Sequence, residues 1–150
     1  MRPAGTIGYE IKMLSNEIKR CMDESILQSG LDGLTGMQGM ILGFLYYREQ
    51  ESQEVFQRDV EREFNIRRST ASGLLRLLER DGYLTRVPVS QDARLKKLCL
   101  TSKAVEAQAL IEQKIHEMDL RLSQGLSEEE QETFYRLIHK IRGNLSGPVA

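Results

Sequence analysis

The chain has no tryptophan, only two cysteines and three prolines in 150 residues, and aromatic residues make up 6% of it. Cys21 and Cys99 are far apart and lack metal-like spacing, which argues against a disulfide-rich secreted scaffold and favours a reducing compartment. The longest apolar neighbourhood, residues 40–47, is well short of the roughly 20 residues that span a bilayer. No signal peptide is evident. We therefore expect a soluble, cytoplasmic protein without a membrane partner.

The sequence also lacks the short motifs of common enzymes and metal sites. It contains no glycine-rich phosphate loop, no nucleophile elbow and no carboxylate cluster on one rigid face. His116 and His139 stand alone, and neither begins a zinc-binding motif. A metal site would need ligands brought together by folding or dimerisation. We predict no enzyme activity, no cofactor and no metal site.

Length and composition indicate one folded domain, residues 1–150. Hydrophobic residues make up 40% of the chain and charged residues 29%, both ordinary values for a globular protein. Apolar residues recur at helical spacing in six segments, whereas only two segments have strand character. The predicted helices lie near residues 9–28, 35–47, 56–64, 67–81, 101–124 and 127–146.

The two strand-like segments, residues 83–89 and 94–100, are separated by the polar stretch SQDA and predict an antiparallel hairpin. Three helices followed by a hairpin is the order of a winged helix-turn-helix. The predicted fold class is therefore mainly α with a small β-hairpin wing. It comprises a winged helix-turn-helix lobe at residues 34–101 and a helical region at residues 6–30 and 102–146.

The fourth helix has two faces of different chemistry at about 100° per residue. The face that must pack is apolar: Ala71, Leu74, Leu75 and Leu78. The opposite arc carries small residues and long cations: Ser69, Ser72, Gly73, Arg76 and Arg80. Small residues allow close approach to a DNA major groove, hydroxyls can contact phosphates or bases, and arginine pairs with guanine or phosphate. A merely solvated face usually mixes Glu and Lys, but this arc has no acid between its first serine and first arginine.

Charge is distributed unevenly along the chain. Residues 66–100 hold eight cations and three acids, a net charge of +5, whereas the remainder holds thirteen cations and nineteen acids, a net charge of −6. The overall charge of −1 therefore conceals a basic patch on an acidic body. This distribution is typical of a protein that meets nucleic acid with one face.

Three stretches, in order and spacing, resemble one known family. They are GLTGMQGMIL at the second helix, RRSTASGLLRLLERDGYLTR across the fourth helix and first strand, and DARLKKLCLT at the wing. The turn Asp92-x-Arg94, followed by Leu100 and Thr101, is the most specific piece. With these motifs, the sequence is similar over nearly its whole length to MarR-family transcriptional regulators.

The resemblance implies a homodimer whose first, fifth and sixth helices, residues 6–30 and 102–146, intertwine. It also implies binding to double-stranded DNA at a palindromic operator, usually as a repressor, with half-sites about one helical turn apart. It places the following residues at or beside the major groove: Arg67, Arg68, Ser69, Thr70, Ser72 and Arg76.

In the wing, the resemblance implies that Arg94 reaches toward the minor groove, where narrow A/T-rich stretches attract cations. Asp92 is expected to orient Arg94 through a salt bridge, because a free carboxylate would be repelled by phosphate. Lys96 and Lys97 alternate across the strand, so only one of them is expected to face a phosphate. The sequence does not decide which.

Two hypotheses concern regulation. Family members often bind small aromatic or phenolic effectors, and Met40, Tyr46 and Tyr47 could line such a pocket, although aromatics at helical spacing also form ordinary core. Other members sense oxidants through a cysteine near the start of the first helix. Cys21 lies late in that helix, which favours a structural role. Arg20 beside it is the kind of cationic neighbour that activates reactive cysteines, so a redox-sensing regulator that uses Cys21 stays open as an alternative.

A protein-interaction module is the alternative to a DNA reader, because winged helices also serve as docking domains. The acid-free arc on the fourth helix favours DNA. The two classes separate on salt dependence, since phosphate contacts release counterions and make affinity fall steeply with salt.

Overall fold

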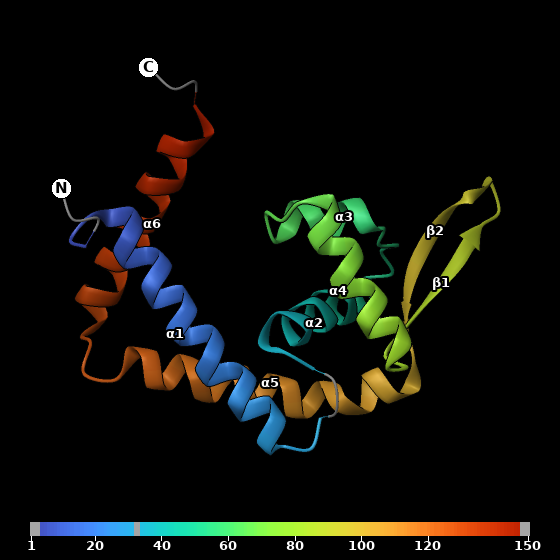
Figure 1. Cartoon of the computed structure of the whole chain (residues 1–150), viewed down its shortest axis with the longest axis horizontal. Coiled ribbons are helices and arrows are strands. Elements are labelled where there is room, and N and C mark those ends of the chain that lie inside the picture. Colours follow the sequence, from blue (N-terminus) through green and yellow to red (C-terminus); the bar gives the residue numbers. More distant parts are fainter. Residues whose placement is uncertain (1–3, 32–33, 148–150) are drawn as a thin grey trace. The chain divides into compact units, whose positions relative to one another are not determined.

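The computed structural model describes residues 4–31 and 34–147. A first compact unit ends at Ile115 and a second begins at His116. The elements follow the predicted order of four helices, a hairpin and two helices (Figure 1). They are α1 Ile7–Gln28, α2 Gly36–Gln50, α3 Gln57–Glu63, α4 Arg68–Arg80, β1 Leu84–Val89, β2 Asp92–Leu100, α5 Ser102–Ser123 and α6 Glu128–Ser146.

The core of the first unit gathers around α2. Fully buried side chains come from α1, α2, α3, α4, the start of the hairpin and α5, and they include three of the four predicted packing residues of α4. The apolar residues with 2% exposure or less are Ile26, Ile41, Leu42, Leu45, Val60, Ala71, Leu75, Leu78, Tyr83, Leu84, Ala104 and Ile111. Burial of this apolar surface is what holds α4 in place with its other face outward.

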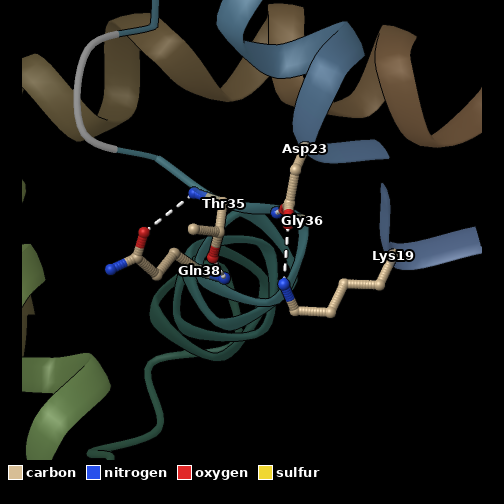
Figure 2. Close-up of polar contacts among 5 residues, drawn as sticks. All are labelled: Lys19, Asp23, Thr35, Gly36 and Gln38. Carbon is tan, nitrogen blue, oxygen red and sulfur yellow. Dashed lines mark hydrogen bonds and ion pairs between the residues drawn. The ribbon is translucent and has the colours of Figure 1, made fainter. Parts of the chain in front are cut away.

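The start of α2 is fixed by a capping box and by a carboxylate from α1 (Figure 2). The Thr35 backbone N–H donates to Gln38 Oε1 at 2.8 Å, and the Gln38 N–H donates to Thr35 Oγ1 at 3.3 Å. Asp23 accepts a hydrogen bond from the Gly36 N–H and is paired with Lys19 at 2.8 Å. A negative charge at a helix N-terminus is favourable, so these contacts tie α2 to α1.

Gly36 is required by packing at this junction. A Cβ added there would lie 2.7 Å from the side chain of Met22, which is closer than real Cβ atoms approach. The glycine therefore permits the close approach of α1 and α2.

The hairpin differs from the prediction at its tip. Strand β2 begins at Asp92 instead of Arg94, so the turn is shorter than SQDA. Pro88 pairs with Lys96 but Val89 pairs with Asp92, which places residues 93–95 within a register irregularity. Proline has no N–H to donate to a ladder and is confined to edges and bulges, which gives a physical reason for the break beside Pro88.

The base of the hairpin is anchored on both sides. The Leu98 N–H donates to the Val55 carbonyl at 2.8 Å, and the Thr101 hydroxyl donates to the Gly82 carbonyl at 2.6 Å. Thr101 Oγ1 also accepts from the Ala104 N–H at 3.3 Å, as expected for a residue that caps α5. The wing therefore projects from a fixed base.

Candidate nucleic-acid interface

The outer face of α4 is open and carries no acid from Arg68 to Leu78. The predicted contact residues on and just before this helix are exposed, apart from Ser72, which is partly buried: Arg67, Arg68, Ser69, Thr70, Ser72 and Arg76. A Cβ added at Gly73 would meet nothing within 4 Å. Intramolecular packing therefore does not require that glycine, and its absent side chain leaves clearance on the outer face.

Three of the eight cations in residues 66–100 are paired with carboxylates. The Nε atom of Arg80 lies 2.9 Å from Asp81 Oδ1, and the Nε atom of Arg86 lies 2.9 Å from Glu79 Oε2. Lys97 Nζ lies 3.5 Å from Glu54 Oε1. The hydrogen bond from Arg80 lowers the pKa of Asp81, so this carboxylate stays ionised at neutral pH. These three cations are partly neutralised by their neighbours.

The other five cations are exposed and have no ion pair with any residue in the described ranges 4–31 and 34–147. They are Arg67, Arg68, Arg76, Arg94 and Lys96. An exposed cation without a carboxylate partner is free to neutralise phosphate without first losing a protein contact. The structure thus divides the basic patch into paired and unpaired cations, which composition alone could not do.

Asp92 contacts Arg94, as expected, but through the backbone of Arg94 and not through its guanidinium. Its carboxylate accepts a hydrogen bond from the backbone N–H of Arg94 at 2.9 Å. No ion pair with the Arg94 guanidinium occurs in the described part of the chain, so the predicted salt bridge was wrong. The side chain of Asp92 can mimic a turn by bonding the backbone two residues on, and it fixes the backbone of Arg94 while leaving the guanidinium unpaired.

Lys96 and Lys97 are distinguished by their surroundings. Lys97 is partly buried and pairs with Glu54 from the connection between α2 and α3, whereas Lys96 is exposed. Of the two, Lys96 is the better placed for a phosphate.

Comparisons with known proteins identify the family of the chain. The sequence model described as "MarR family" matches residues 32–95. An HTH-type transcriptional regulator of Bacillus subtilis, YybA, is 30% identical over 104 residues, which cover 68% of this chain and 69% of that protein. The chain belongs to the MarR family.

Solved structures of MarR-family regulators extend the likeness to almost the whole chain. A DNA complex of S. aureus MepR superposes with a TM-score of 0.83 at 31% identity, covering 93% of this chain and 98% of that one. A MarR regulator of Oenococcus oeni gives a TM-score of 0.71 at 30% identity, covering 92% and 99%. The protein is therefore a transcriptional regulator of the MarR family and not an enzyme.

Sequence reasoning missed a polar network that joins α4 to α3 and β1. Gln57, at the start of α3, donates to Ser72 Oγ at 2.8 Å and to the Arg68 carbonyl at 3.4 Å. Arg86 of β1 donates to Gln57 Oε1 at 3.4 Å and to Glu79 of α4 at 2.9 Å. No sequence signal marks these pairs, because they join residues 7 to 29 positions apart. Together they connect α3, α4 and the wing.

A cleft of about 620 Å³ is lined by two of the three predicted effector residues. Met40 and Tyr47 line it, whereas Tyr46 is not among its lining residues but packs edge-on against the Tyr47 ring. The rings of Phe44 and Phe64, 5.8 Å apart, also line it. The Tyr47 hydroxyl donates to Glu112, and this hydrogen bond raises the pKa of Tyr47.

The two cysteines are free thiols, and both are partly buried. Burial raises the pKa of Cys99, so little of it is thiolate at neutral pH. In the described ranges, no three His, Cys, Asp or Glu side chains lie close enough to hold a metal ion. No helix in the same ranges is both long and apolar enough to cross a bilayer.

Proposed function

We propose that the protein binds double-stranded DNA sequence-specifically and regulates transcription from a palindromic operator, acting in the cytoplasm. The observation that carries the proposal is the grouping of unpaired, exposed cations with small residues on one face of α4 and at the wing. The residues assigned to DNA contact are Arg67, Arg68, Ser69, Thr70, Ser72, Arg76, Arg94 and Lys96. The DNA-bound structure of the similar MepR supports this assignment.

The proposal includes a homodimer built from residues 6–30 and 102–146, with the DNA-binding lobe at residues 34–101. The apolar stripe predicted for α6 is uncovered within the chain: no described residue of that helix is buried, and Leu137 and Leu145 are 46% and 81% exposed. On α1, Ile11 and Leu14 are likewise 41% and 48% exposed. Large apolar surfaces of this kind mark interaction sites, and a second copy would cover them.

We further propose that the protein represses transcription and that a small aromatic effector relieves this repression. The cleft lined by Met40, Phe44, Tyr47 and Phe64 supports a ligand with a planar ring, because aromatic side chains stack on such rings at low entropic cost. Tyr46 is left out of this assignment.

Selection from random duplexes tests the function. The protein should enrich a palindrome whose half-sites are about one helical turn apart. Repeating the selection with a panel of aromatic acids should reduce the recovered DNA if one of them is the effector. Failure to enrich any sequence would contradict operator reading and favour a docking module.

A further inference from the structure

We propose that Gln57 is a positioning residue for DNA reading, which fixes the Ser72 hydroxyl so that it offers a hydrogen-bond donor to the operator. This inference rests on the proposed function. Gln57 donates to Ser72 Oγ at 2.8 Å, and both residues line a cleft of about 550 Å³ on the α4 face, together with Arg76, Arg80, Glu79 and Arg86.

The chemistry of its neighbours determines the orientation of the Gln57 amide. The backbone carbonyl of Arg68 can only accept a hydrogen bond, so the Gln57 nitrogen must face it. The guanidinium of Arg86 can only donate, so the Gln57 oxygen must face that side. Reversing the amide would set acceptor against acceptor and donor against donor. The nitrogen is therefore the atom that meets Ser72.

The contact with Gln57 therefore uses Ser72 as an acceptor and leaves its hydroxyl as a hydrogen-bond donor. A hydroxyl has one O–H donor and two acceptor lone pairs, and one lone pair of Ser72 is occupied by Gln57. Its O–H cannot return a hydrogen bond to the amide nitrogen and donates to no acceptor among residues 4–31 and 34–147, so it can serve a partner outside the protein. Partners of that type are phosphate oxygens and the base acceptors of the major groove, namely guanine O6 and N7, adenine N7 and thymine O4.

Arg86 of β1 holds this arrangement from the wing side, and Glu79 of α4 anchors Arg86. Arg86 is 28% exposed and is anchored to Glu79 at 2.9 Å, which limits where its remaining N–H groups can point. Two hydrogen bonds from α3 to α4 and one from β1 to α3 thus meet at a single side chain. Gln57 lies at the point where the two DNA-binding elements are joined.

The test compares operator selections by four proteins: the parent, Ser72→Ala, Gln57→Met and the double variant. Gln57→Met keeps the length of the side chain but removes both polar atoms. Gln57→Glu serves as a second variant, because a carboxylate keeps a partner for Arg86 but can only accept from Ser72. Gln50→Met, on the exposed end of α2, is the matched control. Circular dichroism and thermal unfolding check that each variant is folded.

We expect Gln57→Met and Gln57→Glu to lose preference at the same operator position as Ser72→Ala. Operator affinity should fall about two- to tenfold, the loss of one hydrogen bond, and the double variant should be no worse than Ser72→Ala alone. Additive losses, or a change at another position, would overturn the positioning role and indicate an independent contact. If Gln57→Met does not fold, Gln57→Glu decides on the same criteria. A parent protein that enriches no sequence would instead refute the proposed function itself.

Discussion

The ammonium of Lys97 lies 3.5 Å from the carboxylate of Glu54, while its neighbour Lys96 is exposed on the same strand. Lys96→Ala should therefore weaken operator binding and make the dependence of log affinity on log salt shallower by about 1, the value for one phosphate contact. Lys97→Ala should change that slope less. Fluorescence anisotropy over a salt series measures both. Equal slope changes would show that the pairing with Glu54 does not separate the two lysines.

Arg76 is unpaired on the outer face of α4, whereas Arg80 one turn later is paired with Asp81. We expect Arg76→Ala to cost about 1–3 kcal/mol of binding free energy and to relax base preference at one position, if it pairs with a base. Arg80→Ala is the control and should cost less. Competition binding with single-base operator variants reports both effects. Arg76→Ala with parental affinity and preference would place the interface elsewhere.

Arg94 should behave differently from Arg76 because it lies on the wing and is expected to reach the minor groove. Arg94→Ala should weaken binding without changing base preference in the major-groove half-sites. The same competition series tests it. Altered preference at the positions read by α4 would contradict the separation of the two elements.

Substitution of Gly73 should change the stability of the protein and its affinity for DNA in opposite directions. Because a Cβ there would meet nothing within the chain, Gly73→Ala should stabilise α4 by up to about 1 kcal/mol through helix propensity. Against DNA, the added methyl should cost about 1–3 kcal/mol, as overpacked contacts do. Thermal unfolding and operator titration measure the two quantities. A variant with unchanged affinity would show that this face does not enter the groove closely.

The exposed apolar stripe of α6 predicts the oligomeric state. Leu137→Asp should convert the dimer to a monomer, because it places a charge on a surface that the proposed dimer buries. Operator affinity should then fall about 100-fold or more, since the second half-site is no longer held nearby. Lys140→Asp, on an exposed position of the same helix, is the control. A parent protein that sediments as a monomer would contradict the proposed homodimer built from residues 6–30 and 102–146.

The sequence predicted the fold well because its signals are local. Apolar periodicity placed all six helices, and Thr35 with Gln38 and Ser127 with Glu130 form the capping boxes that their spacing indicates. The tip of the wing was predicted less well, because register depends on where Pro88 interrupts the ladder.

The site was predictable only in part. Charge and helical spacing identified the outer face of α4, but they could not show which cations have partners. The contacts of Gln57 with Ser72 and of Lys97 with Glu54 join segments brought together by folding. Asp92 was assigned to the correct neighbour but to the wrong atoms, because a short carboxylate can reach a backbone N–H as readily as a guanidinium.

The most direct test of DNA reading by the unpaired cations is the affinity for the selected operator as a function of salt. Five such cations per protomer should give a slope of log affinity against log salt of about −4 or steeper, since each phosphate contact contributes about −0.9. The same measurement on an unrelated duplex should show weaker binding with a comparable slope. A slope near zero, or equal affinity for both duplexes, would contradict the account.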